Sequence, residues 1–173
     1  EVRRIIVLEP TTTAWMYQGD SGVLNRLGND FQKLLLALEA AQVQYDIGCE
    51  YIIAEYGSAG GGKLKIGKAA YDTVILPRYF ENINSSTLRI LEVFLNSGGT
   101  VLSEGDPPAR LDGCVSGKPG ALARHRNWRT VSRENLLKQA VSIQKKTGFW
   151  IERDPKRKGL LFHMQRQVGE DSY

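Results

Sequence analysis

The sequence predicts an α/β fold with a mostly parallel sheet covered by helices. Short continuous apolar runs, such as residues 4–8 and Thr73–Leu76, are typical of strands that are buried on both faces. Segments with apolar residues at helical spacing separate these runs. Strands and helices that alternate in this way build a parallel sheet with helices on both faces. The chain has 173 residues, 42% hydrophobic and 24% charged, which suits one domain with a sizeable core.

The first half of the chain contains two predicted strand regions and one helix. A strand at residues 4–8 is followed by a polar segment, 11–28, which we expect to be a long loop. Asn29 or Asp30 would then cap a helix. Its apolar positions recur at helical spacing: Phe31, Leu34, Leu35, Leu38 and Ala41. Residues 45–56 are expected to be strand, and 58–62 a glycine-rich hairpin turn.

The second half continues the alternation. Strands are expected at Lys63–Ile66, Thr73–Leu76 and 100–103. One helix would be capped by Asn84 or Ser85 and ended by Gly98 and Gly99, and a last helix would run from a Ser132 cap to Gly148. Strand character is expected to resume at 149–151 and again at 160–168. These elements predict a three-layer, flavodoxin-like sandwich over residues 1–150 and a short C-terminal β appendage over 151–173.

Charge and cysteine content narrow the function classes. The net charge of +4 combines −4 over residues 1–117 with +8 over 118–173. A basic face can attract a polyanion, but no nucleic-acid motif accompanies it, so a solvated surface is the favoured interpretation. Cys49 and Cys114 are not in CxxC spacing, and only two histidines are present, so we expect buried free thiols and no metal site. No apolar run approaches the ~20 residues of a membrane span, so we expect no membrane partner.

Candidate binding residues follow the predicted strands. Parallel sheets bind ligands beyond the carboxyl ends of their strands. The ionisable residues expected there are Glu9, Arg78, Glu81, Glu104 and Asp106. Two of these carboxylates could act as a general acid–base pair on a small molecule. The alternative, which we favour, is exposed charge at strand ends, because no histidine is expected at this edge.

No cofactor is expected. The first strand is followed by Glu9, Pro10 and three threonines rather than a Gly-x-Gly-x-x-Gly fingerprint. The threonines could hold a phosphate, but a helix that begins near Asn29 starts too late to direct its dipole at them. Trp15, Met16 and Tyr17 are apolar side chains within the predicted loop. They need a surface to pack on, either in a neighbouring domain or in the core of this chain.

Four stretches of the sequence carry a resemblance to a known family. They are Ile-Val-Leu-Glu-Pro-Thr-Thr-Thr-Ala-Trp-Met (6–16), Leu-Glu-Ala-Ala-Gln-Val-Gln-Tyr-Asp (38–46), Tyr-Asp-Thr-Val-Ile-Leu-Pro (71–77) and Phe-Leu-Asn-Ser-Gly-Gly-Thr-Val (94–101). Residues 3–113 resemble the class I glutamine amidotransferase-like domain that is embedded in large bacterial glycoside hydrolases. These include β-galactosidases with a trimerisation domain and, more closely, α-L-rhamnosidase-like enzymes.

The resemblance does not imply amidotransferase chemistry. Where true amidotransferases place a nucleophilic cysteine, this chain has Ser103-Glu104-Gly105, and a serine without a base is a poor nucleophile. Residues 161–166 resemble the first strand of the β-sandwich that follows this domain in the rhamnosidase-like enzymes. His163 and Arg166 would then lack partners in this chain, and an ordinary edge strand is the alternative.

The resemblance therefore implies a non-catalytic accessory domain of a bacterial glycoside hydrolase that acts on plant or other polysaccharides. Its partners would be catalytic and β-sandwich domains of the same polypeptide, with carbohydrate or an oligomer contact as further candidates. Trp15, Met16 and Tyr17 are the expected domain contact. The absence of Met at position 1 fits an excised piece, and such a parent would be periplasmic or on the cell surface. The alternative is a free-standing small-molecule-binding domain that uses the strand-end carboxylates.

Overall fold

The computed structural model describes residues 3–152, 154, 161–165, 167–168 and 171–172. At its centre is a five-stranded parallel sheet with the strand order β2-β1-β6-β8-β11. Its strands are β1 (Ile5–Leu8), β2 (Tyr45–Gly48), β6 (Thr73–Leu76), β8 (Thr100–Glu104) and β11 (Trp128–Val131). This order is the flavodoxin-like one, with its switch point between β1 and β6. The predicted fold class is confirmed.

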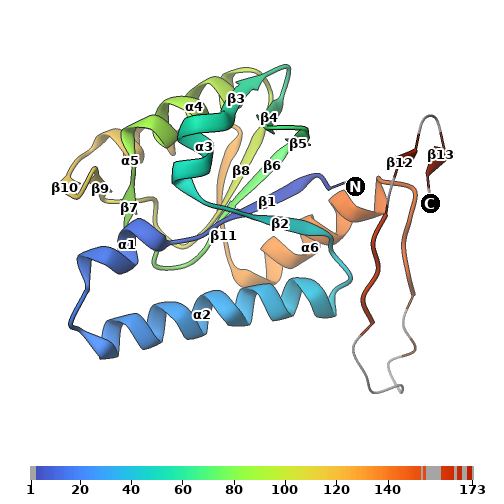
Figure 1. Ribbon diagram of the computed structural model, residues 1–173, viewed down its shortest axis with the longest axis horizontal. Coiled ribbons are helices and arrows are strands. Elements are labelled where there is room, and N and C mark those ends of the chain that lie inside the picture. Colours follow the sequence, from blue (N-terminus) through green and yellow to red (C-terminus); the bar gives the residue numbers. More distant parts are fainter. Residues whose placement is uncertain (1–2, 153, 155–160, 166, 169–170, 173) are drawn as a thin grey trace.

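Helices cover both faces of this sheet (Figure 1). Successive side chains of a strand point to opposite faces, so Ile5 and Val7 pack with α2 (Ser21–Ala40) and α6 (Arg133–Lys145). Ile6 and Leu8 face the other layer, which contains α3 (Glu50–Tyr56) and α4 (Ser85–Asn96). A small antiparallel sheet belongs to this second layer and is formed by β3 (Gly57–Gly60), β4 (Lys63–Ile66) and β5 (Ala69–Tyr71).

Short elements gather at the carboxyl end of the sheet, on the left of Figure 1. They are α1 (Thr11–Met16), β7 (Asn82–Ile83), β9 (Arg110–Leu111), β10 (Cys114–Val115) and α5 (Lys118–Leu122). The C-terminal appendage lies at the opposite end and contains β12 (Gln167–Val168) paired with β13 (Asp171–Ser172). The two ends of the sheet are thus occupied by different parts of the chain.

Several sequence predictions of secondary structure were wrong. Residues 11–28 are largely helical: α1 follows Pro10 directly, and α2 is capped by Asp20, whose Oδ1 accepts the Val23 N–H at 3.0 Å. Residues 45–56 contain a strand only up to Gly48, followed by α3. Residues 149–151 are not strand, whereas Trp128–Val131 is one that the sequence did not indicate. By contrast, Ser132 caps the last helix as predicted and accepts the Asn135 N–H at 3.3 Å.

The described part of the tail lies against the α/β domain. Gln42 Nε2 donates to the Leu161 carbonyl at 2.8 Å, and Gln44 Nε2 donates to the His163 carbonyl at 3.2 Å. His163 Nδ1 lies 3.2 Å from Gln42 Oε1, and its ring centroid is 5.2 Å from that of Phe149. His163 therefore has partners within this chain, contrary to what the resemblance to a β-sandwich strand implied. Residues 161–165 are not in a strand, so the edge strand given as the alternative is not found there. Arg166 lies outside the described residues, and the boundary near residue 150 stays a prediction.

Among the helices of the described residues, none is both long and apolar enough to cross a membrane.

Candidate functional site at the carboxyl edge of the sheet

The predicted strand-end residues do not form one site. Glu9, Arg78 and Asp106 are exposed, whereas Glu104 is buried. Glu9 follows β1 and Glu104 ends β8, and β6 lies between these two strands. Neighbouring strands are about 4.8 Å apart, so the two carboxylates leave the sheet about 10 Å from each other. An acid–base role for a pair of these carboxylates stays a prediction.

Glu104 is engaged in a buried ionic cluster. Arg133 Nε donates to Glu104 Oε1 at 2.7 Å, and Arg133 Nη2 donates to Asp30 Oδ2 at 2.9 Å. The Glu104 side chain is 2% exposed. Its second oxygen, Oε2, is buried with no hydrogen-bond partner among the described residues. The cluster joins β8 to the start of α6 and to α2, so it holds two helices against the sheet.

Ser103 also has an internal role. It is 2% exposed, and its hydroxyl donates to the Gly105 carbonyl at 3.0 Å. Gly105 has a φ of +102°, a conformation that favours glycine, so this hydrogen bond belongs to a tight turn. The Ser103 hydroxyl thus stabilises the backbone after β8.

The three threonines after β1 lie in α1 and face the interior. Thr13 Oγ1 accepts two backbone hydrogen bonds, from the N–H of Glu81 at 3.1 Å and of Asn82 at 3.0 Å. Thr12 Oγ1 donates to Glu50 Oε2 at 2.7 Å, and Glu50 Oε1 accepts the Asn84 N–H at 2.8 Å. The reason given from the sequence against a phosphate here, a late helix start, was wrong. The hydroxyls of Thr12 and Thr13 are instead engaged by internal partners, and the Glu50 carboxylate would repel an anion.

Glu81 is a second carboxylate at this edge that is hydrogen-bonded within the protein. Tyr17 Oη donates to Glu81 Oε2 at 2.5 Å, and Arg110 Nε donates to Glu81 Oε1 at 2.9 Å. The hydrogen bond from Tyr17, together with Arg110, holds the pKa of Glu81 below its ordinary value, and the Glu81 carboxylate raises the pKa of Tyr17. Through these contacts α1 is bonded to the segment after β6, so the switch point is filled by the chain itself.

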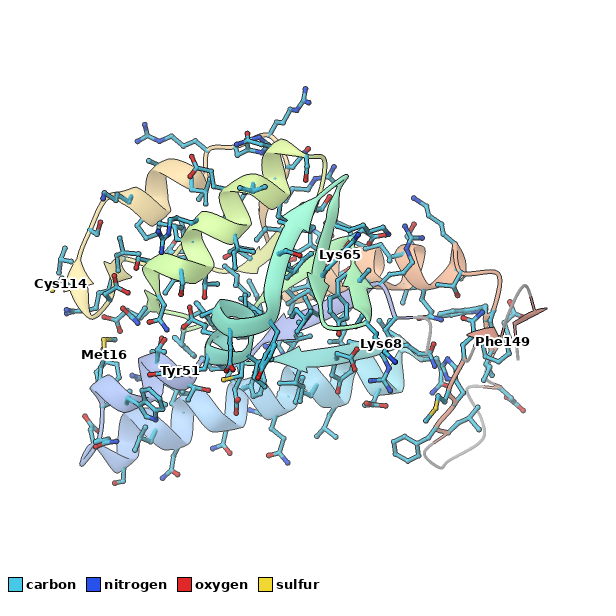
Figure 2. All side chains as sticks on the ribbon, turned by 45° about the horizontal axis from the view of Figure 1, so that its top comes forward. Met16, Tyr51, Lys65, Lys68, Cys114 and Phe149 are labelled. Atoms are coloured by element: carbon cyan, nitrogen blue, oxygen red, sulfur yellow. The ribbon has the colours of Figure 1, made fainter. Side chains whose placement is uncertain are left out.

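The predicted domain contact is divided between the surface and the interior. Trp15 is 49% exposed, and its ring centroid lies 5.5 Å from that of Tyr51, which is 55% exposed. Met16 is half-buried and lies at the same end of the molecule as Tyr51 (Figure 2). Tyr17 is held by Glu81. We define the α1–α3 surface by its exposed apolar side chains: Trp15, Tyr51, Ile52 and Tyr56. Three of these four belong to α3, which the sequence analysis predicted as strand.

The cysteines differ from expectation. Cys49 is half-buried, but Cys114 is exposed on β10, so the prediction that both thiols are buried was wrong for Cys114. Within the described residues, no group of three or more His, Cys, Asp and Glu side chains is placed to hold a metal ion.

Comparison with known proteins gives one informative result. No protein-family model matches the chain, and no curated protein matches it in sequence. Among solved structures it is similar to the apo exo-carrageenase GH42 from Bacteroides ovatus, with a TM-score of 0.54 and 12% sequence identity. The similarity covers 84% of this chain and 18% of the other, so this chain spans less than a fifth of that enzyme. At this identity the likeness concerns the fold.

Proposed function

We propose that this chain is a non-catalytic accessory domain of a bacterial glycoside hydrolase that acts on polysaccharides, and that it packs against a catalytic domain of the same polypeptide. Two observations support the proposal. The fold is similar to a segment that makes up 18% of a glycoside hydrolase chain. The sequence also resembles the amidotransferase-like domains that are embedded in such enzymes.

The closed carboxyl edge is the observation that carries the proposal. Hydrolysis of a glycosidic bond needs two carboxyl groups that face a sugar from opposite sides and exchange protons with it. Three of the carboxylates at this edge instead accept hydrogen bonds from the protein's own donors: Glu50 from Thr12 and Asn84, Glu81 from Tyr17 and Arg110, and Glu104 from Arg133. Glu9 and Asp106 are exposed at the same edge. Each of the three hydrogen-bonded carboxylates would have to lose these bonds before it could serve a substrate.

The α1–α3 surface is the proposed contact with the catalytic domain. Aromatic side chains dominate the energetics of protein interfaces because they bury a large area at low entropic cost. Trp15 and Tyr51 already pack together at a centroid distance of 5.5 Å, so little further ordering is needed when a partner covers them. The proposed contact thus retains Trp15 from the sequence prediction and adds Tyr51 beside it.

The coding sequence on either side of residues 1–173 provides the first test. We expect a catalytic barrel upstream and a β-sandwich downstream. The isolated chain should hydrolyse no aryl glycoside, α-L-rhamnosides included, whereas the full-length protein should hydrolyse at least one. Turnover by the isolated chain, or flanking regions without a glycoside hydrolase domain, would refute the proposal.

The contact itself is tested in the full-length protein. We expect Trp15→Ser with Tyr51→Ser to expose the domain boundary to limited proteolysis and to lower the melting temperature of the catalytic domain. Leu36→Ser is the matched control, because Leu36 is 54% exposed on α2 and lies outside the α1–α3 surface. Equal effects of the two changes would show that the contact lies elsewhere.

A further inference from the structure

A groove between α4 and α5 plays no part in the proposed function. Its volume is about 830 Å³, within the range of 300–1,000 Å³ that is typical of small-molecule sites. The side chains that line it along α4 extend from Ser85 to Asn96. At a rise of 1.5 Å per residue, these positions span about 16 Å of the helix.

The groove combines apolar and cationic side chains. Leu88 of α4, Leu111 of β9 and Leu122 of α5 line it and are half-buried. Arg89, Lys118 and Arg124 also line it and are exposed. At the start of α4, Asp112 Oδ1 accepts the N–H of Ser85, the first residue of the helix, at 2.9 Å.

The three cations have no carboxylate within ion-pair distance among the described residues. Arg89 Nε makes a long contact of 3.4 Å with the Ser85 carbonyl. The acidic groups nearby are Asp112, which caps α4, and Glu92, which lines the same wall as Arg89. Three cations therefore outnumber the two nearby carboxylates, and the groove has an excess of positive charge that attracts anions.

His125 adds a hydrogen-bond donor to this set. Its Nδ1 accepts the Asn127 N–H at 3.1 Å, so Nε2 carries the proton in the neutral ring. The side chain is half-buried and lines the groove. It can therefore donate to an anion without being charged.

We propose that this groove binds an organic anion with an apolar body, such as a medium-chain carboxylate or an aryl sulfonate. The apolar body lies on Leu88, Leu111 and Leu122, and the anionic group lies among Arg89, Lys118 and Arg124. Arginine suits this role because its planar guanidinium donates two parallel hydrogen bonds to a carboxylate or sulfonate. Single-stranded nucleic acid fits less well, because its bases stack on aromatic side chains and the groove is lined by no Phe, Tyr or Trp.

Two probes test the proposal on the whole chain: 8-anilinonaphthalene-1-sulfonate, followed by fluorescence, and decanoate, followed by calorimetry. Both should bind saturably at one site. Amide NMR shifts on binding should concentrate in α4, β9 and α5. The uncharged 1-anilinonaphthalene should bind at least tenfold more weakly, and added salt should weaken the two anions.

Matched variants separate the groove from general positive charge. Arg89→Gln, Lys118→Gln and Arg124→Gln together should weaken both anions at least tenfold. The control changes the exposed residues Lys33, Lys65 and Lys68 to Gln, which alters the net charge equally. Figure 2 shows Lys65 and Lys68 on the small sheet. Equal weakening in the two triple variants, NMR shifts outside the groove, or binding of heparin without binding of either probe would overturn the proposal.

Discussion

Removing Arg133 should destabilise the protein more than removing any exposed cation of the same helix. Arg133 donates to Glu104 and to Asp30 at distances of 2.7 and 2.9 Å. In Arg133→Met the Glu104 carboxylate loses its only described donor, because its Oε2 already lacks one. A carboxylate that is 2% exposed would then be both dehydrated and unpaired.

The expected cost follows from burial. Breaking a buried ion pair by removing one partner typically costs about 3–5 kcal/mol. Arg133 is itself 24% exposed, so water can partly replace it, and we expect the lower end, about 3 kcal/mol. For a chain of this size, that loss corresponds to a decrease in melting temperature of about 6–12 °C.

Urea unfolding followed by far-UV circular dichroism measures this cost. Lys138→Met is the control, because Lys138 and Glu134 form an exposed i,i+4 pair on α6, with side chains 68% and 76% exposed. Such pairs contribute about 0.3–0.5 kcal/mol. Glu104→Gln added to Arg133→Met should recover at least ~1 kcal/mol, because it removes the unpaired buried charge. If Arg133→Met costs no more than Lys138→Met, the cluster does not stabilise the fold and the reasoning is wrong.

Three further predictions concern the same scaffold. Thr13→Val should lower the free energy of unfolding in urea by about 2 kcal/mol, because two backbone N–H groups lose their acceptor. Thr11→Val should leave it unchanged, since Thr11 Oγ1 is buried without a described partner, and equal losses in the two variants would contradict the prediction. Gly99→Ala should destabilise the fold by about 1–3 kcal/mol, because the added Cβ would lie 2.1 Å from the Phe94 ring. Gly28→Ala, where the added Cβ meets open space on α2, should instead raise the melting temperature. Unchanged stability of Gly99→Ala would show that the contact with Phe94 relaxes. Burial alone would raise the pKa of Asp72, but hydrogen bonds from Arg4 and Lys63 outweigh burial and lower this pKa. Hydrogen bonds from Tyr17 and Arg110 lower the pKa of Glu81 in the same way. In acid, the unfolded state therefore binds more protons than the folded state. The stability that these two carboxylates contribute is fully present above the ordinary carboxyl pKa of about 4 and is lost as the pH drops below it. Asp72→Asn should flatten this decline in urea unfolding between about pH 3 and 5, and an unchanged slope would count against the pairing.

Two of the strands that the sequence predicted well are buried on both faces. Ile5–Leu8 and Thr73–Leu76 are continuous apolar runs, and all their residues are buried. Trp128–Val131 was missed because it is an edge strand whose middle residues, Arg129 and Thr130, are exposed. A strand of this kind lacks the uniform apolar pattern that marks a central one.

The helices at the carboxyl edge were missed for a different reason. The start of α2 contains Gly22, Asn25 and Gly28, which have low intrinsic helix propensity, and α3 contains the β-branched pair Ile52 and Ile53. Tertiary contacts overrule these local preferences. Leu27 of α2 is buried, and Ile53 of α3 packs in the core cluster beside the sheet.

The polar contacts of the site depend on distant parts of the chain. Glu104 was identified from its place after a strand, but its partners, Asp30 and Arg133, come from two helices that only the fold brings together. The groove shows the same limit. Lys118 and Arg124 belong to the basic C-terminal part that the sequence analysis recognised, whereas Arg89 comes from the acidic part.

The hydrogen bonds of Thr13 give α1 a direct spectroscopic reporter. The amide protons of Glu81 and Asn82 are donated to a side chain of that helix, not to a neighbouring strand. Their exchange with deuterium requires the hydrogen bonds to Thr13 to break, so its rate measures the free energy of this local opening separately from global unfolding. Slow exchange would mean that these hydrogen bonds break almost only when the whole domain unfolds.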